Sequence, residues 1–347
     1  MRRLPIYFLV DVSESMVGTP IEQVQDGMAA VITELRSDPY ALETAFVSVI
    51  AFAGKPKMIS PLQELYMFYP PKLPIGGGTS LGAALNFLMD EMDRSLQKTT
   101  LEVKGDWKPI VFLFTDGTPT DDYQAAFARW NSQYRSQCNL VAISLGNNLD
   151  TSVLGQISDN VLQLTDTDVP SFKAFFKWVT ASIKTSSVSV SDAGDDSLKL
   201  ASTQGLNLEK VNGKKSVKVD ENFVVLHGKC QTTGKSYLVK YVKDLRPSEY
   251  APYDVLYYKL VGAWPIDGEA YLAMADSSAT NRKINTEELR GMPTCPCCGN
   301  QLGVVVCNCG NIFCAGENLH NQCPWCGMEG ELGRTGEGGV DIARTRG

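Results

Sequence analysis

The first half of the chain alternates between short apolar runs and longer segments in which apolar residues recur every three or four positions. An apolar run bounded by polar residues predicts a strand buried on both faces, whereas the wider spacing predicts an amphipathic helix. Strands are predicted at Ile6–Val10, Thr44–Ala53, Lys108–Thr115, Asn139–Leu145 and Val161–Leu164, with an antiparallel edge at Lys57–Ser60. Helices are predicted at Pro20–Arg36, Ser80–Leu96, Asp121–Cys138, Ser152–Ile157 and Ser171–Ile183. This alternation indicates an α/β fold, with a doubly wound, mainly parallel sheet covered by helices on both faces.

The second half of the chain has a different pattern. Short β-prone runs at Phe223–Leu226, Tyr237–Val242 and Val255–Leu260 lie between turn residues, and the only helical pattern is at Asn285–Arg290. This pattern is typical of a small β-rich module. The sequence thus predicts a first domain at 1–185, a Ser- and Asp-rich linker at 186–198, and a second domain at 199–330. The second domain has a β-rich part at 199–290 and a cysteine-rich part at 291–330, and a flexible tail follows at 331–347.

Composition narrows the class of protein. The 347 residues carry a net charge of −7, which argues against non-specific nucleic-acid binding because such binding needs a basic face. No run reaches the roughly 18 apolar residues of a membrane helix. The two N-terminal arginines and the apolar run after them fit a strand better than a signal peptide, since Asp11 interrupts the run. We therefore expect a cytoplasmic protein that binds neither membrane nor nucleic acid.

Oxygen-bearing side chains follow two of the predicted strands. Asp11, Ser13 and Ser15 come at the end of the first strand, spaced by two residues, and Asp116 comes just past the strand at Lys108–Thr115. Thr79 lies on a glycine-rich turn before a predicted helix. Because ligands of open parallel sheets bind at the carboxyl ends of the strands, we expect these residues to converge there. One alternative is that the serines and Asp11 only cap the following turn. Hard divalent cations prefer such oxygen ligands, so the pattern predicts a metal site.

The segments DVSES, Thr79 and TDG resemble, in the same order, the metal-ion-dependent adhesion site (MIDAS) of the von Willebrand factor A (vWA) domain, which has a Rossmann-like fold. The resemblance covers about the first half of the chain. It implies that Ser13, Ser15 and Thr79 bind Mg²⁺, or Mn²⁺ or Ca²⁺ in its place. It also implies that Asp11 and Asp116 act directly or through water. The family leaves one coordination position open for an acidic group of a partner.

Eight of the ten cysteines lie between Cys295 and Cys326, whereas Cys138 and Cys230 stand alone. Cys295 with Cys298, and Cys323 with Cys326, form two CPxCG knuckles, and paired knuckles are a strong zinc signal. We expect these four thiolates to complete one closed Zn²⁺ site. Cys307, Cys309 and Cys314 remain for a second zinc ion with one further ligand, or one knuckle shares an ion with these middle cysteines. Cys297 is then a spare thiol. A thioredoxin-like redox role for CPWC is less favoured, because the segment is rich in glycine and poor in helix.

The combination of a vWA domain with a C-terminal CPCCGN…CNCGNIFC…CPWCG segment resembles the TerY proteins of bacterial tellurium-resistance systems. The resemblance covers most of the chain, including the β-rich part before the zinc ribbon of the TerY-C domain. It implies a cytosolic protein that works beside a protein kinase and a PPM-type protein phosphatase in a stress response. Cys297 departs from the usual pattern.

Three functions are compared. We favour a non-enzymatic, metal-dependent adaptor that binds a partner's carboxylate or phosphorylated Ser or Thr side chain at the Mg²⁺ site. The first alternative is a Mg²⁺-dependent hydrolase or phosphatase. A haloacid-dehalogenase-type enzyme, however, needs an aspartate where the chain has Ser13, and no HExxH or P-loop motif is present. The second alternative is a scaffold whose metal site is vestigial.

Overall fold

The computed structural model describes residues 2–145, 152–164, 176–184, 208–210, 222–247, 254–276, 282–316, 320–331 and 339–345. The predicted linker at 186–198 lies outside these residues. The chain forms two compact units. The first unit comprises residues 1–12, 19–73 and 79–218, and the second comprises 13–18, 74–78 and 219–347. No helix in the described part of the chain is long and apolar enough to cross a membrane.

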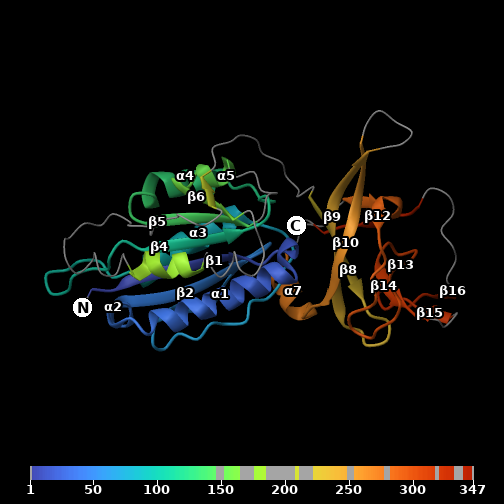
Figure 1. Cartoon of the computed structure of the whole chain (residues 1–347), viewed down its shortest axis with the longest axis horizontal. Helices are drawn as coiled ribbons and strands as arrows, with labels where there is room; N and C mark the ends of the chain where they lie inside the picture. The colour runs from blue at the N-terminus through green and yellow to red at the C-terminus, as the bar shows by residue number, and fades with distance from the viewer. Residues whose placement is uncertain are drawn as a thin grey trace. The chain divides into compact units, whose positions relative to one another are not determined.

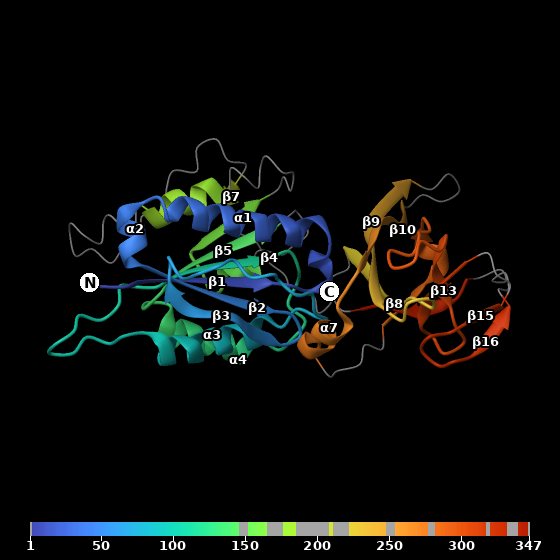
Figure 2. The same cartoon turned by 90° about the horizontal axis from the view of Figure 1, so that it is seen from below.

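The first unit is a seven-stranded sheet with strand order β3-β2-β1-β4-β5-β6-β7. Its strands are β1 (Leu4–Asp11), β2 (Ala45–Phe52), β3 (Pro56–Glu64), β4 (Ile110–Thr115), β5 (Asn139–Leu145), β6 (Asn160–Leu164) and β7 (Leu208–Lys210). Its helices are α1 (Thr19–Leu35), α2 (Pro39–Thr44), α3 (Leu81–Ser95), α4 (Gln124–Arg129) and α5 (Ser152–Gly155), and residues 176–184 are also helical. The five central strands are parallel, and β3 and β7 are antiparallel edges. The predicted doubly wound α/β sheet is confirmed, with α1 over one face and α3 and α4 over the other (Figure 2).

Alternate residues of the buried strands supply two separate cores, as the period of two in a strand requires. Tyr7 and Leu9 of β1 belong to the cluster packed with α3 and α4. Phe8 points to the opposite face, where its ring stacks on Phe112 at a centroid distance of 5.8 Å. Close packing on this face explains the glycine at position 27, inside α1. A Cβ at this position would lie 2.0 Å from the ring of Phe176, so a larger residue would push the two helices apart.

The second unit is built on a six-stranded sheet with strand order β12-β10-β9-β8-β14-β13. Its strands are β8 (Phe223–Lys229), β9 (Ser236–Pro247), β10 (Asp254–Pro265), β12 (Leu289–Arg290), β13 (Leu302–Val306) and β14 (Ile312–Ala315). Two small sheets pair β11 (Lys283–Asn285) with β17 (Asp341–Ala343) and β15 (His320–Gln322) with β16 (Glu329–Glu331). The helix α7 (Gly268–Met274) and single 3₁₀ turns at Glu14–Met16 and Thr286–Glu288 complete it. In Figure 1 the sheet runs from orange β9 and β10 to red β13 and β14.

Four details of the predicted organisation need correction. The strand β7 pairs with β6 in the first sheet, so residues 208–210 belong to the first unit and not to the β-rich part. The predicted β-rich and cysteine-rich parts share one sheet, because β8 pairs in parallel with β14. The segment Asp341–Ala343 of the predicted flexible tail is a strand, held by its pairing with β11 and by buried Ile342. The pattern at Asn285–Arg290 forms a 3₁₀ turn between two short strands rather than a helix.

Candidate metal centres

The acidic residue Asp11 ends β1, and the acidic residue Asp116 directly follows β4. Val10 pairs with Phe114 in register, so Asp11 and Thr115 are the next neighbours along these strands. The Thr115 hydroxyl donates a hydrogen bond of 2.6 Å to Asp11 Oδ2, which fixes the orientation of that carboxylate. Asp116 follows directly, and both carboxylates are buried. Thr115 was not among the predicted site residues, although its position at the strand end is readable from the sequence.

Thr79 is held at the start of α3 by the loop that follows β4. Its backbone N–H donates to Thr120 Oγ1 at 3.0 Å, and the Thr120 N–H donates to the Thr79 carbonyl at 2.7 Å. Its own Oγ1 is buried and has no hydrogen-bond partner among the described residues. A buried hydroxyl without a partner is costly, and a cation would satisfy this oxygen. The neighbouring Asp121 accepts from the Ala83 N–H at 3.0 Å, and burial raises the pKa of its carboxyl.

Ser13 and Ser15 follow Asp11 in the chain, Ser13 immediately before the 3₁₀ turn Glu14–Met16 and Ser15 within it. Both side chains are fully buried, and their hydroxyl oxygens lie 2.9 Å apart in a hydrogen bond. The five predicted ligands therefore offer only oxygen atoms, and all five are buried. This donor set fits a hard divalent cation such as Mg²⁺.

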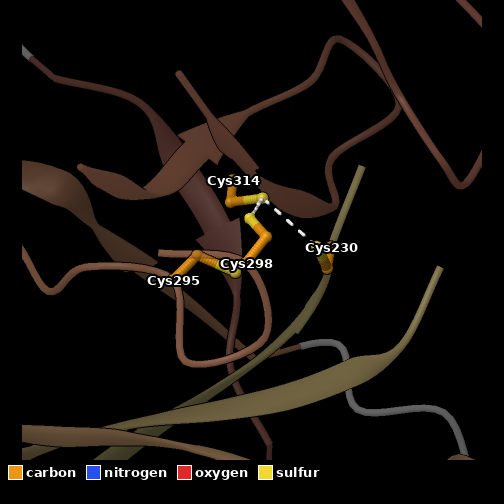
Figure 3. Close-up of side chains that lie close together, drawn as sticks. All are labelled: Cys230, Cys295, Cys298 and Cys314. Atoms are coloured by element: carbon orange, nitrogen blue, oxygen red, sulfur yellow. Dashed lines mark hydrogen bonds between the residues drawn. The ribbon is translucent and has the colours of Figure 1, made fainter. Parts of the chain in front are cut away.

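The cysteines of the second unit form two clusters of four. The first cluster comprises Cys230, Cys295, Cys298 and Cys314, and the second comprises Cys307, Cys309, Cys323 and Cys326. Within each cluster the four sulfur atoms lie within 4.8 Å of one another. The sulfurs of Cys298 and Cys314 are 3.7 Å apart, and those of Cys314 and Cys230 are 3.8 Å apart (Figure 3). In the second cluster, Cys307 and Cys326 are separated by 3.6 Å.

These separations are those of a tetrahedral thiolate site. Zinc–sulfur bonds of about 2.3 Å at tetrahedral angles put the sulfurs about 3.8 Å apart. The structure thus corrects the grouping of Cys295, Cys298, Cys323 and Cys326 around one ion. The knuckle of Cys323 and Cys326 joins the middle cysteines Cys307 and Cys309, as the interleaved alternative predicts. The knuckle of Cys295 and Cys298 joins Cys314 and Cys230, and Cys230 was not among the predicted ligands. Cys297 lies outside both clusters.

Strand pairing explains how Cys230 reaches the first cluster. In the parallel pair β8 and β14, Lys229 is opposite Phe313, so the next residues, Cys230 and Cys314, are also neighbours. Cys230 also begins a turn of the same kind as the knuckle at Cys295. In both turns the cysteine carbonyl accepts from the N–H of a glycine four residues later, at 2.9 Å. Both glycines, Gly234 and Gly299, have positive φ, which favours glycine. The segment CQTTG therefore carries a readable knuckle signal in which Thr233 replaces the second cysteine.

The chain matches two family models. The von Willebrand factor type A domain matches residues 6–177, and the TerY-C metal binding domain matches residues 220–347. The chain has the TerY-type architecture. The predicted resemblance is therefore confirmed, and the second domain begins after β7, in agreement with the pairing of that strand.

Several solved structures are similar to parts of this chain. Proximal thread matrix protein 1 from the mussel byssus is 16% identical with a TM-score of 0.39, over 53% of this chain and 48% of its own. A second structure of that protein, described with a zinc occupied MIDAS motif, is 18% identical with a TM-score of 0.38, over 52% of this chain and 46% of its own. A von Willebrand factor type A protein from Catenulispora acidiphila is 15% identical with a TM-score of 0.42, over 77% of this chain and 56% of its own. This chain thus spans about half the length of these proteins.

The local environment prepares one thiol in each cluster of the TerY-C domain for metal binding. Burial alone would raise the pKa of Cys230, but hydrogen bonds with Thr233, Cys298 and Thr232 together outweigh it and lower this pKa to about 6. Burial also acts to raise the pKa of Cys309, but hydrogen bonds with Asn311, Cys307 and Cys326 together lower it to about 7. Burial raises the pKa of Cys314 to about 11 and that of Cys307 to about 12. A metal ion binds thiolates, so these two thiols release protons when it binds.

Proposed function

We propose that the protein is a non-enzymatic adaptor that binds a partner protein through a divalent cation at its vWA site. Mg²⁺, or Mn²⁺ or Ca²⁺, would be held by Asp11, Ser13, Ser15, Thr79 and Asp116. The observation that carries this proposal is that these five oxygen-bearing residues are all buried, and that Thr79 Oγ1 has no hydrogen-bond partner among the described residues.

The charge of the site supports an anionic ligand. The five residues supply only two formal negative charges, so a bound Mg²⁺ would still attract an anionic oxygen of a partner. Carboxylates and phosphorylated Ser or Thr side chains both carry such an oxygen. A phosphorylated side chain is the sharper candidate if the partner is a kinase substrate.

The two cysteine clusters support structural zinc. Four thiolates at tetrahedral spacing close the coordination shell, which leaves no position for a catalytic water. The two Zn²⁺ ions would hold the turns at Cys230, Cys295, Cys307 and Cys323 together. HExxH and P-loop motifs are absent from the sequence, and the segment Gly78–Gly82, which fits GxSxG, does not directly follow a strand as a nucleophile elbow does. Both observations favour binding over catalysis.

The cellular setting is proposed from the family resemblance. A TerY-type protein would act in the bacterial cytoplasm, in a tellurium-resistance or general stress response. A protein kinase and a PPM-type phosphatase would be its functional neighbours, and the phosphorylated group at the metal site would link it to both.

The proposal is tested by calorimetric titration of matched phosphorylated and unphosphorylated peptides, each with and without Mg²⁺. We expect binding of the phosphorylated peptide in Mg²⁺ only, and loss of this binding in Asp11→Ala with the fold retained. Equal binding in all four conditions would contradict the proposal. Persistent Mg²⁺-independent binding by Asp11→Ala would favour the scaffold with a vestigial site.

A further inference from the structure

The residue between the two serine ligands, Glu14, is tied to α7 in the second unit. Glu14 is only 1% exposed. The Tyr271 hydroxyl donates to Glu14 Oε1 at 2.7 Å, and the Gly78 N–H donates to Glu14 Oε2 at 2.9 Å. A buried carboxylate is retained only where hydrogen-bond donors replace its hydration, so these two donors fix where Glu14 lies.

A second buried polar contact reaches the same segment from β9. Lys240 is 4% exposed, and its ammonium group donates a hydrogen bond to the backbone carbonyl of Ser15. Lysine is rarely buried without a specific polar partner. This contact acts on the backbone of a predicted metal ligand rather than on a neighbouring residue.

Apolar packing also holds the segment 13–18 in place. Val17 belongs to a small core with Val225, Leu238 and Tyr271. Gly18 has a φ of +85° and lies against Trp264, where a Cβ would be 2.6 Å from the ring. The turn that carries both serines is therefore fixed at its middle, at Ser15 and at its end by groups between residues 225 and 271.

We propose that Tyr271 and Lys240 are positioning residues of the metal site, Tyr271 through Glu14 and Lys240 through the Ser15 carbonyl. This inference rests on the proposed function. Neither residue touches the cation. Ser13 and Ser15 would bind it with hydroxyl groups whose place depends on the backbone of the turn. Partners that orient ligands in this way change metal affinity about 10- to 100-fold when they are removed.

The test uses the full chain with both zinc sites loaded. Tyr271→Phe removes only the hydroxyl and keeps the ring that packs with Val17. The matched control is Tyr237→Phe, because Tyr237 is also buried and its hydroxyl donates at 2.8 Å to the Gly303 carbonyl instead. Lys240→Met removes the ammonium group and keeps an apolar stem. Hydrogen–deuterium exchange of the amides of residues 13–18 is measured without Mg²⁺, and Mg²⁺ affinity is measured by calorimetry.

We expect faster exchange at residues 13–18 in Tyr271→Phe and Lys240→Met, with at least about 10-fold weaker Mg²⁺ binding. Tyr237→Phe should match the wild type in both measurements. Unchanged exchange at residues 13–18 in both variants would overturn the inference, whether or not the Mg²⁺ affinity changes. An equal increase in exchange and an equal loss of Mg²⁺ affinity in Tyr237→Phe would also overturn the inference, since the effect would then be general destabilisation. The proposed function fails separately, if the wild-type chain does not bind Mg²⁺ at all.

Discussion

Replacing Cys230 with alanine should weaken the binding of one of the two metal ions of the second unit. Cys230 is the one ligand of the first cluster that lies outside the cysteine-rich segment, and its sulfur is 3.8 Å from that of Cys314. The substitution leaves Cys295, Cys298 and Cys314 in place. Three thiolates cannot close a tetrahedral shell, so water must take the fourth position.

The expected loss of zinc affinity follows from the binding free energy of a site with four ligands. Structural zinc sites contribute about 10–16 kcal/mol of binding free energy, which is about 3 kcal/mol for each of four ligands. A loss of about 3 kcal/mol is roughly a 100-fold weaker affinity. The second cluster shares no ligand with the first, so its ion should keep its affinity.

Native mass spectrometry of the zinc-loaded chain counts the bound zinc ions, and titration with a chelator measures the affinity of each ion. The matched control is Cys297→Ala, because Cys297 lies in the same knuckle but in neither cluster. We expect two zinc ions in the wild type and in Cys297→Ala. In Cys230→Ala one ion should be lost at a chelator concentration that leaves the other in place. Two ions of unchanged affinity in Cys230→Ala, or the loss of one ion in Cys297→Ala, would refute the assignment.

Three further changes test other parts of the structure. Thr115→Val removes the hydroxyl that orients Asp11 and should weaken Mg²⁺ binding roughly 10-fold by calorimetry. Burial, with a smaller effect of Lys229, lowers the pKa of His227 from 6.5 to about 4. Between pH 4 and 6.5 the unfolded chain therefore binds a proton at His227 that the folded chain does not bind. Stability should therefore fall by up to roughly 3 kcal/mol on acidification from pH 6.5 to 4, and urea unfolding of His227→Gln should lack this contribution. Asp267→Ala removes the cap that accepts from the Glu269 N–H at 3.0 Å and should cost about 1 kcal/mol in urea unfolding.

The local spacing of apolar residues was sufficient to predict the main strands and helices of the first unit. The apolar run Ile6–Val10 lies within β1, and the helical spacing at Pro20–Arg36 corresponds to α1, because burial on both faces and burial on one face leave different periods in a sequence. The helix predicted at Asp121–Cys138 is less regular. It begins at Gln124 and changes at Trp130 into a π-helical turn, which spacing alone does not reveal.

Pairing between distant segments accounts for what the sequence did not reveal. The partner of Cys314 in the first cluster is 84 residues earlier in the chain, and only the register of β8 with β14 brings the two together. The same reason applies to β7 and β17, which are three-residue strands with almost no pattern of their own. The choice of Asp11, Ser13 and Thr79 as metal ligands remains a prediction, supported by their burial at the ends of the expected elements.

The most direct test of the metal sites is an anomalous difference map from crystals of the zinc-loaded chain grown with Mn²⁺ in place of Mg²⁺. The account predicts three peaks in each chain. Two zinc peaks should lie at the centres of the two cysteine clusters, and one manganese peak should lie among Asp11, Ser13, Ser15, Thr79 and Asp116. An oxygen site without a peak, with its side chains turned apart, would contradict the central claim, and one shared zinc peak between the two knuckles would contradict the interleaved clusters.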